Sequence, residues 1–576
     1  VCSTAGVAPP LLALTGTAST SVLVDMLNDL GISDETAIIQ PGSFDRPEIH
    51  YRIVLADSEH KQDALDYITT TAIPRDFGAY PTGFYDPRGD ASNCGIVFCP
   101  HANGSYGIMA KKRQLEHGHL GVWDHLQQRY PGLCTYYSGK PPERLGIGDA
   151  KWGEQKREQA ASFKENRSTM MVATKAFGMG IDKPNIRWVV HYGMPGSLES
   201  YYQEVGRAAR DRNVAYAYLI LSDDFPELNE ELLDPTRTPV TEMRGKDESA
   251  KGKWNGDDVS RVVFFHASTF EGVRDELAIA RRVLDACERA NYRGGQWYVV
   301  FSQEQKEDYE RAIYRFILLG VFQDYAIDYH YGGGEFVITP SRMRGNTLRE
   351  HVVECYMAHI AAYQPDEAYL KAARKGLIEA VSHARTDRDY IMAAMDHLLR
   401  SFVYRVLEES RRRSTLIMLE AAKRAASAGS IDATDAEFRR EMLAYLATDE
   451  QLGKKRGIRS VINDATNVSL LLSVLGQRDE AGLQELLGQS SRLLEDYPQH
   501  YGLHFLQAAV HCLNGDLDRM GTSLRSMVGF GIESYGLTQD ECRQNFVTFL
   551  NSKSARGIQA ETIDALLPVL GNALDT

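Results

Sequence analysis

Long apolar runs, a dense cysteine pattern and an excess of positive charge are all missing from this 576-residue sequence. No stretch reaches the roughly 20 apolar residues that a membrane helix requires, and the start lacks the charged-then-apolar order of a secretory signal. The eight cysteines are scattered, which indicates reduced thiols rather than a disulfide framework. We therefore expect no membrane association and a cytoplasmic location.

The balance of charge limits the kinds of surface that the protein can offer. The sequence holds 64 Lys and Arg residues against 78 Asp and Glu residues, a formal net charge of −14. A chain with this balance has no generally basic coat, so any contact with nucleic acid must use local basic patches and backbone amides. Hydrophobic residues make up 43% of the sequence, as in ordinary globular proteins, and the length suffices for three or four domains.

The most informative segment of the sequence spans residues 169–211. Its apolar run at 170–173 predicts a buried parallel strand. Thr174 follows that strand, and Phe-Gly-Met-Gly at 177–180 then predicts a sharp turn. Such a turn can reach a phosphate backbone, because glycine lets the main chain approach a bound group closely.

A second group of polar residues follows at 203–211, with the sequence Gln-Glu-Val-Gly-Arg-Ala-Ala-Arg-Asp. Arg207 and Arg210 are three residues apart, which predicts that both side chains lie on the same side of a helix. Two guanidinium groups in this arrangement can clamp phosphate oxygens. Taken singly, each arginine would be an ordinary surface ion-pair residue, but the order of strand, turn, strand and helix favours the clamp.

Together the two groups resemble motifs V and VI of the RecQ branch of superfamily 2 helicases. The resemblance implies an α/β, RecA-like motor domain that uses ATP and Mg²⁺ as cofactors and acts on DNA. The implied catalytic residues are Arg207 and Arg210, which would reach the γ-phosphate as arginine fingers, and Gln203, which would set their geometry. The implied nucleotide-binding residues are Asp182, Gly180 and Gly206, and the implied nucleic-acid-binding residues here are Thr174 and Gly178. Ala209 departs from the family, which usually has glycine there, but both arginines remain.

Three upstream segments agree with the same family. They are LLALTGTA at 11–18, SFDRPEI at 43–49 and the apolar strand GIVFC at 95–99, which resemble motif III, the linker between two motor domains and motif IV. Thr15, Cys99 and His101 are therefore further candidates for contact with nucleic acid. As metal ligands, Cys99 and His101 are only two, so we predict no metal site.

The phosphate loop and the acidic pair of such a motor are missing from the sequence. No Gly-Lys pair is followed by Ser or Thr, as a loop that cradles phosphates requires. Asp366 and Glu367 imitate the acidic pair, but they follow Pro365 and lead into a helical pattern, which predicts a helix start. We therefore expect a first motor domain, either upstream of Val1 or on another polypeptide, to hold most of the ATP and Mg²⁺ contacts, and this chain alone to be inactive.

These landmarks predict five segments. They are the end of the first RecA-like domain at 1–45, the second RecA-like domain at 46–234, a polar linker at 235–258, a winged-helix-like domain at 259–345 and a helical domain at 346–576. The winged helix rests on a helix at 304–319, followed by the alternating Tyr325, Ile327 and Tyr329 and then a glycine turn. The last segment has helical periodicity and is partly tetratricopeptide-like at 504–524, which favours a domain that binds a partner protein.

Two classes of function remain open. The first is an ATP-dependent DNA helicase or translocase of RecQ type, in which this chain supplies the arginine fingers and grips nucleic acid. The second is a non-catalytic DNA-binding or scaffold subunit with a degenerate motor fold, for example in a DNA-modification or defence system. The intact Gln203, Asp182 and pair of arginines favour the first.

Overall fold

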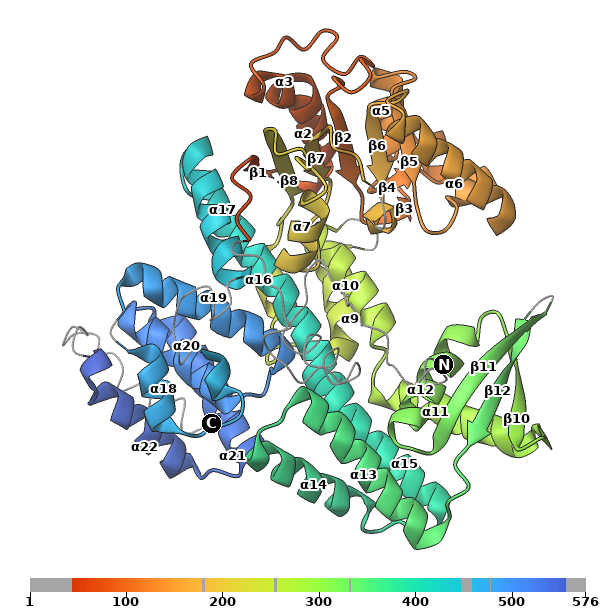
Figure 1. Cartoon of the computed structure of the whole chain (residues 1–576), viewed down its shortest axis with the longest axis vertical. Coiled ribbons are helices and arrows are strands. Elements are labelled where there is room, and N and C mark those ends of the chain that lie inside the picture. The colour runs from red at the N-terminus through yellow and green to blue at the C-terminus, as the bar shows by residue number, and fades with distance from the viewer. Residues whose placement is uncertain are drawn as a thin grey trace, which may run out of the picture. The chain divides into compact units, whose positions relative to one another are not determined.

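The computed structural model describes residues 44–178, 182–252, 256–330, 333–446, 458–476 and 478–555, and the chain divides into two compact units (Figure 1). The sheet unit comprises Ser43–Thr269 and Arg412–Leu446. The helical unit comprises Phe270–Arg411 together with the described residues of Ala447–Thr576. Each unit buries its own set of apolar side chains. Within the described residues, no helix is both long enough and apolar enough to cross a membrane.

A six-stranded parallel sheet forms the middle of the sheet unit. Its strands are β1 (Ile49–Leu55), β2 (Cys94–Phe98), β5 (Cys134–Tyr137), β6 (Met170–Ala173), β7 (Ile186–His191) and β8 (Ala215–Leu221). They lie in the order β1-β8-β7-β2-β6-β5, and every neighbouring pair is parallel. All residues of β2 and β6 are buried, as expected when helices cover both faces of a parallel sheet. The predicted α/β, RecA-like parallel sheet is confirmed, with its strand at 170–173.

Short helices and one small extra sheet connect these strands. The helical segments are η3 (Ser58–His60), α2 (Lys61–Tyr67), η4 (Ile68–Ala72), α3 (Ile73–Asp76), α4 (Lys112–Glu116), α5 (Val122–Arg129), η5 (Glu143–Leu145), α6 (Asp149–Lys164), η6 (Lys175–Gly178) and α7 (Leu198–Val205). Strands β3 (His101–Asn103) and β4 (Gly107–Met109) pair with each other in parallel. On β2, Gly95 lies so close to the ring of Trp188 on β7 that any side chain there would collide with it. A glycine is therefore required at this point of the core.

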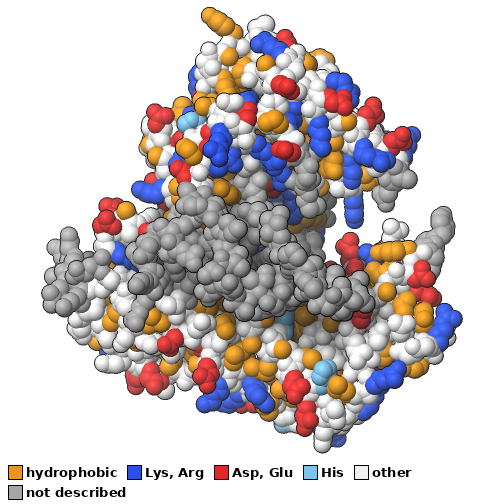
Figure 2. Space-filling view, in the orientation of Figure 1, with side chains coloured by type: hydrophobic (Ala, Val, Ile, Leu, Met, Phe, Trp, Pro, Cys, Tyr) orange, Lys and Arg blue, Asp and Glu red, His pale blue; other side chains and the backbone are white. Residues whose placement is uncertain are grey.

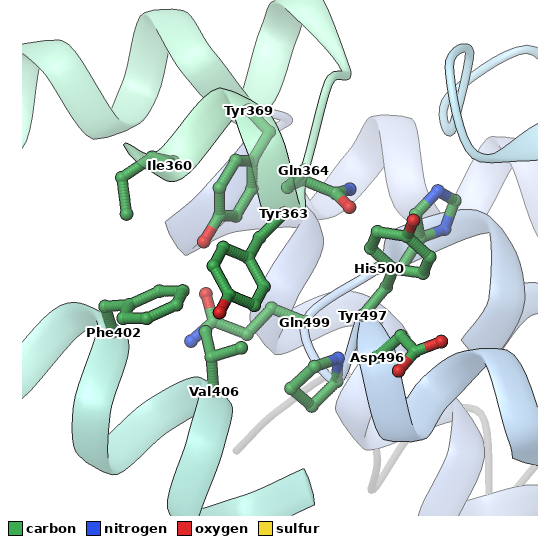
Figure 3. A pocket seen from close by; sticks show the side chains of 11 residues that line it. Ile360, Tyr363, Gln364, Tyr369, Phe402, Val406, Asp496, Tyr497, Gln499 and His500 are labelled. Carbon is green, nitrogen blue, oxygen red and sulfur yellow. The ribbon is translucent and has the colours of Figure 1, made fainter. Parts of the chain in front are cut away.

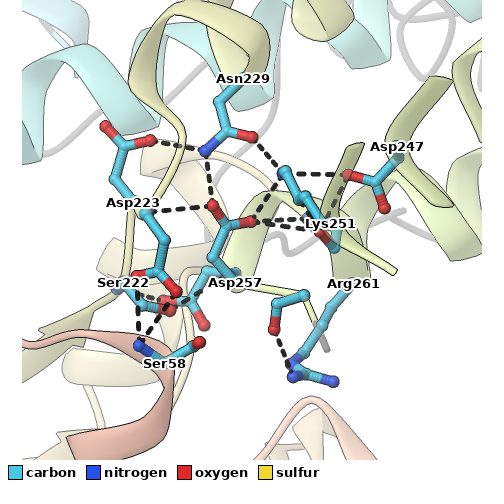
Figure 4. Close-up of polar contacts among 12 residues, drawn as sticks. Ser58, Ser222, Asp223, Asn229, Asp247, Lys251, Asp257 and Arg261 are labelled. Carbon is cyan, nitrogen blue, oxygen red and sulfur yellow. Dashed lines mark hydrogen bonds and ion pairs between the residues drawn. The ribbon is translucent and has the colours of Figure 1, made fainter. Parts of the chain in front are cut away.

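The segment expected to be a polar linker, 235–258, is instead mostly helical. It lies among α8 (Pro226–Leu233), α9 (Val240–Lys251) and α10 (Asp258–Thr269). The charged residues that suggested a loop include a buried group: Lys251 is fully buried and contacts Asp247 at 2.9 Å and Asp257 at 3.0 Å (Figure 4). Asn229 of α8 donates to the second oxygen of Asp257 at 2.7 Å. The polar composition was misleading because these charges compensate one another inside the fold.

A second buried lysine joins α10 to the sheet. Lys61 of α2 donates to both carboxylate oxygens of Asp258, at 2.6 and 2.7 Å, and neither side chain is more than 1% exposed. Asp258 also accepts from the backbone N–H of Ser222, just after β8, at 3.0 Å. Burial lowers the pKa of Lys61 and raises the pKa of Asp258, while their mutual attraction opposes both shifts. This single ion pair thus connects three elements of the unit.

Two helices from far along the chain complete the sheet unit. They are most of α16 (Glu409–Ala426) and all of α17 (Ile431–Leu446). Arg412 is buried and donates to the carbonyl of Thr238 at 2.5 Å, and Phe438 packs its ring between those of Tyr51 and Tyr201. Helical periodicity predicted a single helical domain over 346–576, but this pattern shows only that a helix has an apolar face. It does not show which unit that face contacts.

The helical unit begins with a mixed segment. Its elements are α11 (Val273–Arg289), β9 (Asn291–Arg293), β10 (Gln296–Ser302), α12 (Lys306–Leu318), β11 (Phe322–His330) and β12 (Gly333–Pro340). The four strands form an antiparallel sheet in the order β11-β12-β10-β9. The predicted helix and hairpin are therefore present. That this segment works as a winged helix stays a prediction.

Helices make up the rest of the helical unit. They are α13 (Gly345–Tyr363), α14 (Glu367–Val381), α15 (Asp387–Leu398), η7 (Leu399–Glu408), η9 (Ile458–Val461), α18 (Val468–Leu475), α19 (Glu480–Asp496), α20 (Tyr501–Leu513), α21 (Leu517–Tyr535), α22 (Gln539–Leu550) and η10 (Lys553–Ala555). Asp366 caps α14 by accepting from the N–H of Tyr369 at 3.0 Å, so its prediction as a helix start is confirmed. Helices α13, α14 and η7, the end of α19 and the connection from α19 to α20 surround a pocket lined by Tyr363, Phe402 and Tyr497 among others (Figure 3).

Candidate functional site

The two arginines of the predicted clamp lie in a turn that follows α7. The helix begins at an N-cap in which Ser197 accepts from the N–H of Ser200 at 3.1 Å, and it ends at Val205. Arg207 and Arg210 therefore do not share a helix face, contrary to the expectation from their spacing. The chain leaves the helix at Gly206 and turns through two fully buried alanines. The turn, not the helix, sets the directions of the guanidinium groups.

Ala209 is the strained point of this turn. Its φ is +53°, in the left-handed region that favours glycine, and its side chain is fully buried. Its N–H donates to the carbonyl of Ile186 on β7 at 3.1 Å, and its own carbonyl accepts from Arg212 at 2.9 Å. These two bonds hold a conformation that costs an alanine on the order of 1 kcal/mol. The glycine that the resemblance leads one to expect here would remove that cost.

Arg210 meets Asp182, which brings together residues from the two predicted motifs. The Nη1 atom of Arg210 donates to Oδ1 of Asp182 at 2.9 Å. The arginine side chain is 36% exposed and the aspartate side chain 85% exposed, so water screens this pair strongly. The pair is therefore weak enough for another anion to displace Asp182.

In the part of the chain that the structure describes, Arg207 has a buried donor without an acceptor, a feature that it shares with other arginines such as Arg261 and Arg349. Its Nε–H is buried and has no hydrogen-bond partner among the described residues. Burial lowers the pKa of Arg207, and the charge of Arg210 lowers it further. A buried N–H of a cation without an acceptor is costly. An oxyanion at this point would satisfy the donor and relieve the repulsion between the two arginines.

Arg46 holds the turn from the opposite side. Its Nη2 donates to the carbonyls of Ala209 at 3.0 Å and Ala208 at 3.3 Å, and its Nε pairs with Glu48 at 2.5 Å. The adjoining carbonyl of Phe44 accepts from Tyr202 of α7 at 2.9 Å. Sequence reasoning identified the SFDRPEI segment only as a linker and missed this role. Arg46 belongs to that segment, so the sequence already contained the residue that contacts the turn.

Gln203 and Glu204 lie on the last turn of α7. Gln203 donates to Glu199 at 3.5 Å, one turn earlier on the same helix. Glu204 contacts Nε2 of His191 at 2.8 Å, and His191 ends β7 with only 1% of its side chain exposed. This contact fixes the end of α7 to the end of β7. Neither His191 nor Glu204 was expected from the sequence.

The residues predicted to contact nucleic acid do not all lie in the same part of the structure. Thr174 directly follows β6, donates its N–H to the carbonyl of Tyr137 at 3.1 Å and accepts from Phe177 at 3.0 Å. Gly178 ends the short helix η6. Thr15 and the nucleotide-binding candidate Gly180 lie outside the described residues. Thr174 and Gly178 therefore lie just beyond the carboxyl end of β6, at the edge where ligands of open parallel sheets bind.

Cys99 and His101 do not form a common site. Cys99 is 4% exposed within the hydrophobic core, and burial raises its pKa strongly. Cys99 follows the last residue of β2, and its buried side chain lends no support to the predicted contact with nucleic acid, which stays a prediction. Burial, aided by the charge of Arg261, lowers the pKa of His101 to about 4, and its ring packs 4.8 Å from that of Phe265. Among the described residues, no group of three or more possible ligands could hold a metal.

Comparison with known proteins agrees with this geometry. Residues 148–212 match the model of the helicase conserved C-terminal domain. The ATP-dependent DNA helicase RecQ of Pasteurella multocida is 28% identical over 42% of this chain and 32% of its own length. The ATP-dependent helicase SGS1 of Saccharomyces cerevisiae is 31% identical over 37% of this chain and 12% of its own length. The ATP-dependent DNA helicase hus2/rqh1 of Schizosaccharomyces pombe is 32% identical over 37% and 13%.

The chain thus spans a third or less of the length of these relatives. Among solved structures, the yeast DEAD-box splicing factor Prp28 overlaps 32% of both chains at 20% identity with a TM-score of 0.21, a likeness too slight to carry an argument. The helicase match covers β6, β7 and α7 together with both arginines of the turn. Residues 148–212 therefore match a helicase conserved C-terminal domain, and about two fifths of the chain is similar to RecQ-type helicases.

Proposed function

We propose that this chain supplies the arginine-finger half of an ATP-dependent DNA helicase or translocase of RecQ type. One observation carries the proposal. The turn after α7 places the buried, unpartnered Nε–H of Arg207 near the weakly paired Arg210. Two adjacent positive charges that lack a strong acceptor suit the γ-phosphate of a nucleotide.

The residues of the turn suit contact with the phosphate oxygens of ATP. Bound ATP supplies the phosphoryl group whose transfer to water releases the energy for movement. Arg207 would bind a phosphate oxygen through its unpartnered N–H, and Arg210 would exchange Asp182 for another. Gln203, on the last turn of α7, would set the approach of both. Mg²⁺ would come with the nucleotide, which the resemblance places mainly on another motor domain.

DNA is the proposed ligand at the carboxyl end of β6. Thr174 and Gly178 follow the carboxyl end of β6, where a backbone turn can donate to phosphates. On the face drawn in Figure 2, Lys and Arg side chains are frequent over the sheet unit, with acidic side chains among them. Local patches of this kind suit contacts to phosphate in a chain whose net charge is −14. The helical unit is the proposed site for a partner protein.

Arg210→Ala tests the proposal in the complete enzyme. ATP hydrolysis with saturating single-stranded DNA should fall by roughly a thousandfold or more, the scale of arginine fingers. Nucleotide affinity should change little, because the charge acts mainly in the transition state. Arg210→Lys should restore little, since an ammonium lacks the planar fork that meets two oxygens.

Arg167→Ala is the matched control for this measurement. Arg167 also forms an exposed ion pair in the sheet unit, with Glu165 at 2.9 Å, and lies outside the turn. Its removal should leave turnover unchanged. Near-normal hydrolysis by the Arg210→Ala enzyme would overturn the arginine-finger assignment.

The alternative is a non-catalytic DNA-binding or scaffold subunit with a degenerate motor fold. If the complete protein binds DNA but neither binds nor hydrolyses ATP, this alternative replaces the first proposal.

A further inference from the structure

A side chain from the distant helix α17 holds the SFDRPEI segment in place. The Nη1 atom of Arg439 donates to Oδ1 of Asp45 at 2.8 Å and to the carbonyl of Arg46 at 3.0 Å. Its Nη2 donates to the carbonyl of Ile49, where β1 begins. The Arg439 side chain is 18% exposed, so water screens these bonds only partly. One guanidinium thus binds three acceptors spread along five residues of the segment.

A second residue of α17 anchors the next stretch of β1. Asp435 accepts from the backbone N–H of Tyr51 at 2.8 Å, and its other oxygen meets Nδ1 of His50 at 3.0 Å. Between these polar contacts, Phe438 packs 5.6 Å from the ring of Tyr51 and 5.3 Å from the ring of Tyr201 on α7. Helix α17 therefore contacts both β1 and α7. Helix α7 leads into the turn at residues 206–210, which is called the arginine turn from here on.

The contacts continue from the segment to the turn. Arg439 fixes the backbone at Arg46, and the side chain of Arg46 in turn binds the carbonyls of Ala208 and Ala209. Those two alanines separate Arg207 from Arg210 in the chain. The backbone at Ala209 is held in a left-handed conformation that alanine adopts unwillingly, so it needs external support. Two arginines in series therefore supply that support.

We propose that Arg439 is a positioning residue for the arginine turn, and that α17 is a working part of the nucleotide-facing site. Its effect on turnover rests on the proposed function, whereas its effect on the turn rests on geometry alone. Losing Arg439 leaves the carbonyl of Arg46 with one donor, the backbone N–H of Ile49 at 3.0 Å, so the Arg46 backbone and its side chain are held less firmly. The turn then adopts further conformations, in which the guanidinium groups of Arg207 and Arg210 are no longer held near each other.

Amide hydrogen exchange on this chain tests the geometric part. In Arg439→Ala, amides in residues 206–213 should exchange about tenfold faster, as expected when hydrogen bonds to a charged group are lost. Amides of β2 and β6, at the centre of the sheet, should keep their protection. Unchanged exchange at 206–213 in a folded Arg439→Ala chain would overturn the proposal.

Arg440→Ala is the matched control. Arg440 is the next residue on α17, its side chain is 58% exposed, and it bonds to Glu437 of its own helix at 2.6 Å. Its removal should leave exchange in the turn unchanged. Should Arg439→Ala fail to fold, Asp45→Ala removes one acceptor and leaves the other two. The same amides should then exchange faster, though by a smaller factor, and no change would again overturn the proposal.

Steady-state kinetics of the complete enzyme test the consequence for catalysis. Arg439→Ala should lower kcat about tenfold while KM for ATP changes little, because a mispositioned finger acts in the transition state. An equal loss of nucleotide binding, or an unchanged kcat, would overturn the positioning role. If the wild-type enzyme hydrolyses no ATP, the proposed function fails by itself. The exchange experiment then still decides whether Arg439 holds the turn.

Discussion

Two groups of charged residues in the sheet unit differ in how completely their charges are paired. Lys61 and Lys251 are fully buried, and each meets carboxylate oxygens at 3.0 Å or less. Arg207 and Arg210 lie in a turn, where one N–H is left without a partner and the other arginine holds an exposed aspartate. The first group is compensated within the fold, and the second is not.

The difference separates charges that secure the fold from charges that serve a ligand. A buried lysine with complete carboxylate partners joins elements but offers nothing to a bound molecule. An arginine with an unsatisfied donor beside a strained backbone can instead donate to a bound anion. We therefore expect substitutions in the lysine network to change stability strongly, and substitutions in the turn to change stability little.

Lys61→Met should have the largest effect on stability. It leaves Asp258 buried without its cation, which should lower the free energy of unfolding by about 3–5 kcal/mol. Chemical denaturation of the sheet unit measures this loss. The double variant Lys61→Met with Asp258→Leu removes both charges and should recover most of it. If the double variant is as unstable as the single one, packing rather than charge accounts for the loss.

Acid should weaken the fold through His101. Burial lowers its pKa from 6.5 to about 4, so between these values the unfolded chain binds a proton that the folded chain rejects. Its contribution is fully present above pH 6.5 and is lost as the pH falls towards 4, by at most about 1.4 kcal/mol per pH unit. His101→Phe should flatten the stability profile in that window, and an unchanged profile would contradict the assignment.

Ala209→Gly should have a smaller effect of opposite sign. Relief of the left-handed alanine outweighs the entropy that glycine loses on folding, for a net gain of about 0.5–1 kcal/mol. Thermal unfolding of the two chains compares them directly. A loss of stability would show that the bonds at this turn do not compensate a strained residue.

Arg210→Ala should have the smallest effect on stability, within about 0.5 kcal/mol, because its pair with Asp182 is exposed. The same denaturation experiment measures it. A loss near that of Lys61→Met would remove the distinction between the two groups.

Local pattern predicted individual elements in both units. The apolar run at 170–173 is strand β6, the alternation through Tyr325 and Ile327 is strand β11, and Asp366 caps a helix. Each depends on neighbours in the chain, whose spacing reports which side is buried. The helix end at Val205 was missed, because the turn at Ala209 is held by Ile186 and Arg46 rather than by adjacent residues.

The sequence by itself therefore determined the parallel sheet and the pair of arginines, since both follow from residues close together in the chain. Only the tertiary structure decided how the arginines are aimed and which charges are compensated. Arg439 meets Asp45 across 394 residues, and Lys61 meets Asp258 across 197. Contacts at such separations produce no periodic pattern in the sequence, because an ion pair does not depend on how far apart its two residues lie in the chain.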